Sequence, residues 1–381
     1  MARRALDLTG LGGLLVFGTG CGYNGKVFCA KAGEAMDLME RLGRFTQALG
    51  LPGYEEQAAQ AVAEAFREVT DQVEIGPMYN VAARMGREGP HFMVTAHQDE
   101  IGLMVLTVEE DGCLRFTTMG GVDTRILPAM PVTVYARSGP LQGIVGAKPP
   151  HLLTPADQKK AVQLKDLYID LGLDPQTCRE TVRPGDLAAL TGPLVKLEDG
   201  RWAGKTLDDR ACVCSMLAAA QWLKRLRAPA RVSFVAASQE EVGSRGATAA
   251  TWALEPDVAI VLDVTHGDCP GAGKWETFPL DKPTITIGPN VHPALGRRLK
   301  QTAQDNGIDF SLEPCGHVTY TDAEVTQVSR AGVPTVLIGV PLKYMHTTVE
   351  MVQERTITEA GRLVALFIDE LARGWEEIQW Y

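Results

Sequence analysis

Two adjacent carboxylates, Glu240 and Glu241, stand at the end of an apolar run in the second half of the chain. Residues 231–238 have the composition of a short buried strand, and the two glutamates follow within two residues. Carboxylates beside a buried sheet end are costly to desolvate unless a cation compensates their charge. A divalent metal ion would do so, with one glutamate binding the ion and the other transferring protons. Taken alone, the pair favours a simpler interpretation, a solvated helix start whose acids face the helix dipole.

The rest of the chain reverses that preference, because other candidate residues occupy the same kind of position, the end of a strand or the turn beyond it. These residues are His97 with Asp99, Asp208, Asp263 and His346. Open α/β sheets place their active sites at the carboxyl ends of the strands, so these side chains can converge in space. Two histidines and three carboxylates suit two divalent ions that share one carboxylate bridge. A capping aspartate or a buried histidine would explain each position singly, but not the whole set.

The spacing of His97 and Asp99 adds a detail to this hypothesis. A metal-bound imidazole usually donates its other N–H to a carboxylate, which fixes the tautomer and raises the basicity of the ligand. Asp99 is a candidate for that role because it lies two residues after His97. A helix or turn cap is the alternative role for Asp99.

The segments that carry these residues alternate between strand and helix patterns. We expect strands at 91–96, 231–238, 257–264 and 334–340, and helices at 37–49, 55–69, 207–226, 293–306 and 352–372. This alternation is typical of an α/β layer architecture. Short β-like runs separated by turns, at 113–118, 131–136, 141–145 and 186–190, indicate a small inserted barrel or sandwich. The predicted domains are therefore a catalytic domain of residues 36–106 and 205–381 and an inserted β domain of residues 107–204.

Composition excludes several classes of partner. The chain has 381 residues, of which 45% are hydrophobic and 22% charged, and its net charge is −10 with scattered basic residues. We therefore expect no nucleic-acid partner. No apolar run reaches the ~18 residues that span a bilayer, so no membrane association is expected. The eight cysteines include no Cys-x-x-Cys pair, which favours reduced thiols and a cytoplasmic location.

The first 35 residues differ from the rest. A basic start is followed by a Gly- and Leu-rich stretch up to Cys21, as in a secretory or lipoprotein signal. Asp7 and five glycines interrupt the apolar part, and no good cleavage site precedes Cys21. We expect residues 1–35 to be a poorly ordered extension or a misassigned start, with a signal peptide as the alternative.

An ordered series of motifs resembles the co-catalytic metallo-aminopeptidases that include glutamyl aminopeptidases, the tetrahedral TET aminopeptidases and proteins labelled endoglucanase or cellulase M. The resemblance runs from about residue 36 to about residue 378. Each motif is weak alone, and the specific signal is their order and spacing. The motifs are AHQDEIG at 96–102, GGVD at 120–123, GAKPPH at 146–151, LDDR at 207–210, QEEVG at 239–243 and PLKYMH at 341–346.

The resemblance implies a role for each candidate residue. Asp208 would bridge two metal ions. His97 and Asp263 would be the remaining ligands of one ion, and Glu241 and His346 those of the other. Glu240 would be the general base, and Asp99 would orient His97. The implied fold is a phosphorylase/hydrolase-like mixed-sheet α/β domain with an inserted small β-barrel-like domain used in oligomer contacts. Two divalent ions per subunit are implied, zinc in the first place with cobalt or manganese as alternatives, together with a peptide substrate and a homo-oligomer, often a dodecamer.

The chain departs from the family pattern in its N-terminal extension and in extra histidines. His266 and His317 lie near motif positions, but the implied ligand set is complete without them, so we expect neither to bind metal. His151 is expected to have a structural or rim role.

The candidate residues and the ordered motifs together predict a metal-dependent aminopeptidase. A deacylase or carboxypeptidase on the same scaffold is the main alternative. A glycosidase would use only the two glutamates, and a non-catalytic scaffold would be expected to have lost a ligand or the base.

Overall fold

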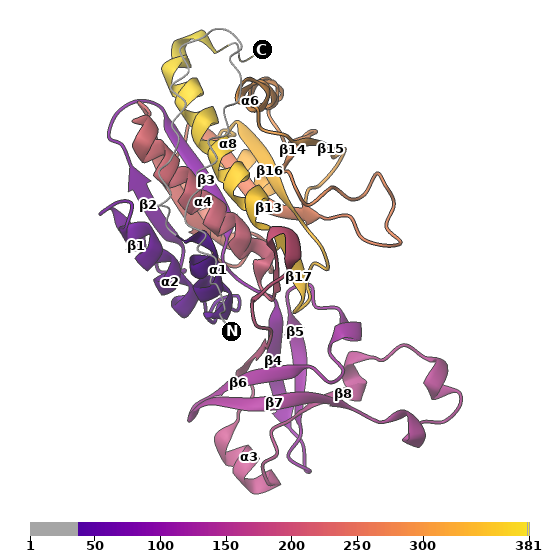
Figure 1. Cartoon of the computed structure of the whole chain (residues 1–381). Helices are drawn as coiled ribbons and strands as arrows, with labels where there is room; N and C mark the ends of the chain where they lie inside the picture. The colour runs from indigo at the N-terminus through magenta and orange to yellow at the C-terminus, as the bar shows by residue number, and fades with distance from the viewer. Residues whose placement is uncertain (1–36, 379, 381) are drawn as a thin grey trace, which may run out of the picture. The chain divides into compact units, whose positions relative to one another are not determined.

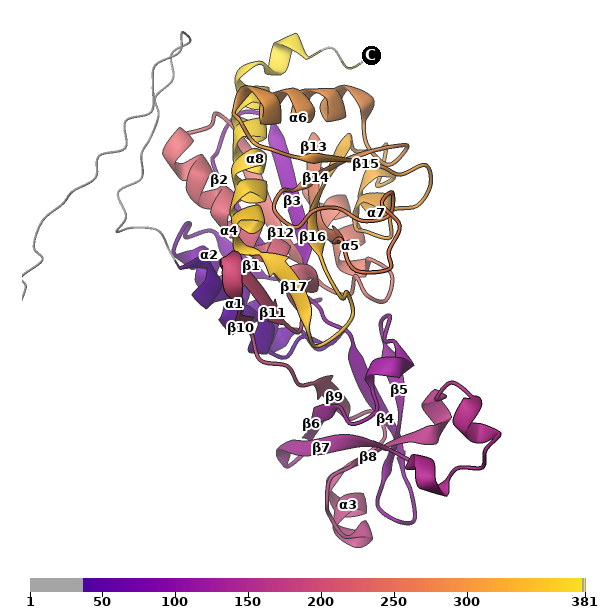
Figure 2. The same cartoon turned by 45° about the vertical axis from the view of Figure 1, so that its right-hand side comes forward.

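The computed structural model describes residues 37–378 and residue 380. The extension predicted for residues 1–35 lies outside the described residues. Within them, the chain forms a mixed α/β layer structure and a separate closed barrel (Figures 1 and 2). This architecture confirms the predicted fold class, a mixed-sheet α/β domain with an inserted small β-barrel.

An eight-stranded mixed sheet forms the centre of the α/β part, in the order β1-β2-β12-β3-β13-β16-β14-β15. Its strands are β1 (Val73–Ile75), β2 (Val81–Met85), β3 (His91–His97), β12 (Arg231–Ala237), β13 (Val258–His266), β14 (Thr284–Ile287), β15 (Ser311–Pro314) and β16 (Thr335–Leu342). The four central strands β12, β3, β13 and β16 are mutually parallel. Their carboxyl ends therefore lie along one edge of the sheet, where open α/β folds bind their ligands.

Helices cover both faces of the sheet. One face carries α4 (Leu207–Leu226) and α8 (Glu354–Arg373), which lie side by side, with α1 (Leu38–Gln47), α2 (Glu56–Arg67) and α6 (Pro293–Asp305) beside them (Figure 1). The other face carries α5 (Arg245–Leu254) and α7 (Ala323–Gln327). Because both faces are covered, the central strands are almost continuously buried.

The barrel closes in the order β4-β5-β8-β7-β6-β9 (Figure 2). Its strands are β4 (Gly102–Val108), β5 (Leu114–Met119), β6 (Pro131–Ala136), β7 (Gly139–Ala147), β8 (Leu167–Asp170) and β9 (Leu187–Leu190), and helix α3 (Pro175–Thr181) follows β8. Alternate side chains such as Leu103, Phe116, Val132 and Ile169 fill its own apolar core. The barrel strands span residues 102–190, which differs from the insert of residues 107–204 expected from the sequence. The difference arises because β4 continues directly from the turn after β3.

A third, three-stranded sheet pairs the segment that follows the barrel with a segment near the last helix. It contains β10 (Val195–Lys196), β11 (Arg201–Gly204) and β17 (Glu350–Gln353). The last helix, predicted from residue 352, begins at Glu354 because residues 350–353 pair with β11 as a strand. Short 3-10 helices are η1 (Thr124–Ile126), η2 (Pro150–Leu152), η3 (Asp157–Lys159), η4 (Leu164–Asp166), η5 (Glu198–Gly200) and η6 (Trp375–Glu377).

Two further observations concern the described residues only. None of their helices combines the length and the apolar character that crossing a bilayer requires. Their six cysteines, Cys113, Cys178, Cys212, Cys214, Cys269 and Cys315, are all free thiols.

Candidate metal centre

The structure brings the predicted chemical residues together at the carboxyl edge of the central strands. His97 is the last residue of β3, Glu240 and Glu241 follow β12, and Asp263 lies near the end of β13. Asp208 lies in the first turn of α4, and His346 lies in the loop between β16 and β17. For the residues at the ends of β3, β12, β13 and β16, convergence follows from the parallel pairing, since these strands all run toward the same edge.

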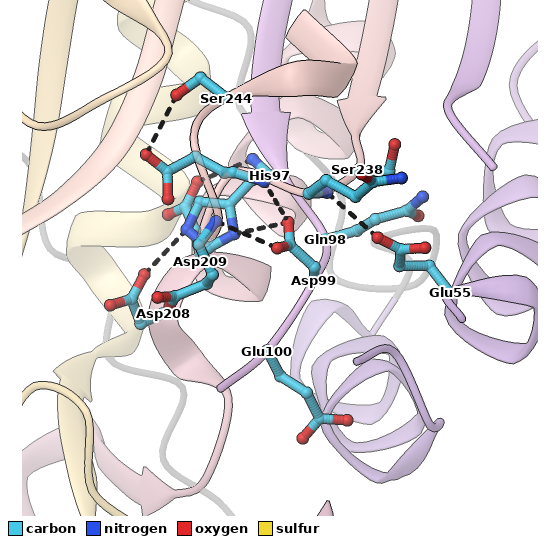
Figure 3. A network of polar contacts seen from close by, with 12 residues as sticks. Glu55, His97, Gln98, Asp99, Glu100, Asp208, Asp209, Ser238 and Ser244 are labelled. Atoms are coloured by element: carbon cyan, nitrogen blue, oxygen red, sulfur yellow. Dashed lines mark hydrogen bonds and ion pairs between the residues drawn. The ribbon is translucent and has the colours of Figure 1, made fainter. Parts of the chain in front are cut away.

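The five predicted metal ligands form two groups that share one carboxylate. His97, Asp208 and Asp263 form one group, here called the inner triad, and Asp208, Glu241 and His346 form the other, the outer triad. Within each triad the potential ligand atoms lie within 4.8 Å of one another. Asp208 offers one oxygen to each side. Its Oδ1 is 3.0 Å from His97 Nε2 (Figure 3). Its Oδ2 is 3.3 Å from His346 Nε2.

The electrostatics of the two triads favour a divalent cation. Burial raises the pKa of Asp263 well above its usual value, and the neighbouring Asp209 adds to this effect. Burial alone would also raise the pKa of Asp208, but the His346 and His97 imidazoles hold it below its usual value. Burial alone would lower the pKa of His97, but its contacts with the Asp208 and Asp99 carboxylates raise it well above its usual value. Converging carboxylate and imidazole atoms in an acid-rich, buried pocket are a donor set that fits divalent ions such as zinc, cobalt or manganese.

Asp99 connects the turn after β3 to the turn after β12. Its Oδ1 accepts a hydrogen bond from the Glu240 N–H at 2.9 Å, and its Oδ2 accepts one from the Glu241 N–H at 3.1 Å (Figure 3). Its Oδ1 also lies 3.4 Å from His97 Nδ1, which is within ion-pair range but longer than an ordinary hydrogen bond. The observed contacts thus place Asp99 beneath the two glutamates as well as beside His97.

Glu240 lies beside both triads without belonging to either. Its Oε1 is 3.4 Å from the Ser244 hydroxyl (Figure 3). Burial raises the pKa of Glu240 to about 8, and the nearby carboxylates of Asp322, Asp99 and Glu241 act in the same direction. A carboxyl group with a pKa near neutrality, close to the ligand atoms but not among them, is suited to transfer protons.

The sequence analysis missed three carboxylates that hold the site through backbone N–H groups. Buried Glu350 accepts from the backbone of Leu207, Asp208 and His346 at 2.8, 3.1 and 2.8 Å. Asp209 accepts from the His97 N–H at 3.3 Å, and Glu55 accepts from the Gln239 N–H at 3.1 Å. Residue type and spacing carry no signal for Glu350 or Glu55, since their partners are distant in the chain. Asp209 could have been found from its place beside Asp208.

A fourth carboxylate, Asp322, lies buried near Glu240 with no hydrogen-bond partner for either oxygen among the described residues. Burial raises its pKa to about 7. The three additional histidines lie outside both triads. His266 and His317 are exposed, and His151 is exposed in η2 of the insert.

The chain is similar in sequence and structure to known aminopeptidases. A family model described as M42 glutamyl aminopeptidase matches residues 80–363. A lysyl aminopeptidase of Pyrococcus furiosus is 34% identical over 338 residues, covering 87% of this chain and 97% of that protein. A solved aminopeptidase from the archaeon Desulfurococcus kamchatkensis has a TM-score of 0.83 and 32% identity, covering 90% of this chain and 97% of its own. The Pyrococcus horikoshii TET1 peptidase has a TM-score of 0.78 and 29% identity, covering 88% of this chain and all of its own.

Proposed function

The chain belongs to the M42 glutamyl aminopeptidase family, whose members are hydrolases acting on peptide bonds, and from this premise we propose a two-metal aminopeptidase mechanism for it. The observation that carries the proposal is the pair of triads that share Asp208. In this proposal His97, Asp208 and Asp263 hold one divalent ion, and Asp208, Glu241 and His346 hold the other. Zinc is the proposed metal, and cobalt and manganese suit the same ligand atoms.

Residues around the triads would transfer the proton and position the base. Bound ions would acidify a water molecule and polarise the scissile carbonyl. Glu240 is the proposed general base: it accepts the proton of the attacking water and delivers it to the leaving amine nitrogen. Its place outside both triads and next to the ligand Glu241 supports this role. Asp99 holds the backbone of Glu240 and Glu241 and thereby fixes the distance between the base and one ligand.

The acidic character of the centre also supports recognition of a free α-amine. Several carboxylates converge at the carboxyl edge of the sheet, and an N-terminal ammonium group is the part of a peptide that complements them. A deacylase or carboxypeptidase would use the same donor set but would not require a free amine. The substrate requirement therefore separates the proposal from its main alternative.

The proposal extends to assembly and location. The Pyrococcus horikoshii TET1 peptidase can assemble into a tetrahedron or a large octahedral shell, and we propose a homo-oligomer for this chain as well. A cytoplasmic location is proposed on the basis of the six free cysteines among the described residues.

Hydrolysis of aminoacyl chromogenic amides tests the reaction. Metal-stripped protein is supplied separately with zinc, cobalt or manganese, and N-acetylated amides serve as controls. We expect metal-dependent cleavage of free amines only. Equal cleavage of the blocked amides would favour the deacylase, and no cleavage with any metal would contradict the proposed activity.

The base is tested with Glu240→Gln, beside Glu64→Gln, which changes an exposed glutamate on α2 in the same way. We expect Glu240→Gln to lower kcat by roughly 10²–10⁴-fold, the usual contribution of a general base, while the protein keeps both ions. Elemental analysis measures the ions. Turnover near the wild-type rate would show that Glu240 is not the base.

A further inference from the structure

A turn of the inserted barrel reaches the outer triad. Strand β5 ends at Met119, and Gly120 and Gly121 follow it directly. The Gly121 carbonyl oxygen is 2.8 Å from His346 Nδ1. Because a carbonyl can only accept a hydrogen bond, Nδ1 must carry the proton. In the neutral ring this leaves the lone pair on Nε2, the nitrogen that lies 3.3 Å from Asp208 Oδ2 and 3.4 Å from Glu241 Oε1.

The turn also packs against the outer ligands so closely that it has no room for a side chain. A Cβ atom at Gly121 would lie 2.7 Å from both Cε1 and Nδ1 of His346. A Cβ atom at Gly120 would lie 2.9 Å from Glu241 Oε2. Both distances are shorter than van der Waals contact, so the two glycines allow the barrel backbone to touch the two ligands that belong to the outer triad alone.

His346 depends on such support more than the other histidine ligand does. Its φ of 59° lies in the left-handed region, which is unfavourable for a residue with a side chain, and its side chain is 31% exposed. Its backbone N–H also donates a hydrogen bond to the Glu350 carboxylate. The loop touches the barrel again where the Thr348 hydroxyl lies 3.8 Å from the Met130 sulfur.

The glycine turn is itself tied to the inner triad. Met119 pairs with Gly102, the first residue of β4, and Gly102 follows the turn that carries His97 and Asp99. The distance between His97 and the Gly121 carbonyl is therefore set by one short turn and one pair of strands. Pairing of this kind transmits position without a flexible linker.

From these contacts we propose that the inserted barrel completes the outer half of the metal centre, and that Gly121 is a positioning residue that fixes the ring and tautomer of His346. The inference rests on the two-metal centre proposed above and extends it. The barrel thus takes part in the chemistry of its own subunit. Partners that orient a metal-bound imidazole usually contribute about 10–100-fold to metal affinity.

Gly121→Ala tests the inference. Gly121 does not have a positive φ, so the added methyl acts through its contact with His346 and not through backbone strain. Gly316→Ala is the matched control, because a Cβ there would have no neighbour within 4 Å. His346→Asn serves as the reference for loss of the outer ligand.

Zinc and cobalt binding are measured by calorimetry on metal-stripped protein, with elemental analysis after dialysis and thermal melting of the metal-free form. We expect Gly121→Ala to lower the affinity for one of the two ions by about 10–100-fold and to leave the affinity for the other ion unchanged. The metal-free variant should melt at the same temperature as the metal-free wild type. Selective ¹⁵N labelling of histidine, with His346→Asn for assignment, should show a protonated Nδ1 at His346 in the metal-loaded wild type.

Titration of the wild type with metal distinguishes failure of this inference from failure of the proposed two-metal centre. Wild type that binds two ions, beside Gly121→Ala that binds both equally well, would overturn this inference alone. Wild type that binds fewer than two ions would contradict the proposed function, and this inference with it. If Gly121→Ala fails to fold, an unprotonated Nδ1 at His346 in the labelled wild type would still overturn the inference.

Discussion

The inner and outer triads differ in how the chain holds them. His97 and Asp263 lie on neighbouring parallel strands, two residues beyond the paired residues Thr95 and Val261, and both are buried. Glu241 and His346 lie in loops, and the His346 loop touches the barrel. Sheet register therefore positions the inner ligands, whereas the outer ligands depend on hydrogen bonds between distant segments. A metal site on a packed sheet needs fewer auxiliary contacts than one built on loops.

Substitution of the shared ligand Asp208 should have the largest effect, because it removes a ligand from both triads at once. Asp208 gives one oxygen to each triad, and asparagine has neither the negative charge nor a second oxygen to replace them. We expect Asp208→Asn to lose both ions, with a fall in affinity larger than the roughly 10–100-fold caused by loss of an orienting partner. Elemental analysis after dialysis measures the result. Retention of one tightly bound ion would show that the triads do not share this carboxylate.

A matched pair of variants should separate the triads. Asp263→Asn removes a ligand from the inner triad only, and His346→Asn removes one from the outer triad only. We expect each variant to retain one ion. The ion left in His346→Asn should be released more slowly by a chelator, because the inner ligands are buried and fixed by strand pairing. Equal release rates from the two variants would show that the inner triad does not hold its ion more firmly than the outer triad.

Proton release should give the smallest and most specific signal. Burial alone would lower the pKa of His346, but its hydrogen bonds to the Asp208 and Glu241 carboxylates raise it to about 11 in the metal-free protein. At pH 7 the ring is therefore protonated and must lose its proton before Nε2 can bind an ion. Affinity at the outer triad should accordingly rise with pH below about 11.

Calorimetry in buffers of different ionisation enthalpy counts the protons released on metal binding. Per bound ion, the outer triad of Asp263→Asn should release at least about one proton from His346. His346→Asn should not release this proton. Total proton release by the wild type should therefore exceed that of His346→Asn by at least about one proton, and equal totals would show that His346 does not bind as the neutral ring.

The sequence predicted the main features of the fold because hydrophobic period and turn residues are local signals. The helix expected at 207–226 is α4, and the four strands expected before the candidate residues are β3, β12, β13 and β16. The short strands β14 and β15 were not predicted, since four-residue strands provide too little periodicity. Strand β17 was also missed, because its pairing with β11, about 150 residues earlier in the chain, overrides a local pattern that favours helix.

Residue type and position at strand ends were enough to select His97, Asp208, Glu240, Glu241, Asp263 and His346 for the centre. These choices rest on chemistry that the side chains carry wherever the fold places them. The tertiary structure alone decided how Asp208 divides its oxygens and which backbone groups Glu350 holds. It also decided that the Gly121 carbonyl meets His346, 225 residues away in the chain. Hydrogen bonds through backbone atoms leave no mark in residue identity, because every residue offers the same carbonyl and nearly every residue the same N–H.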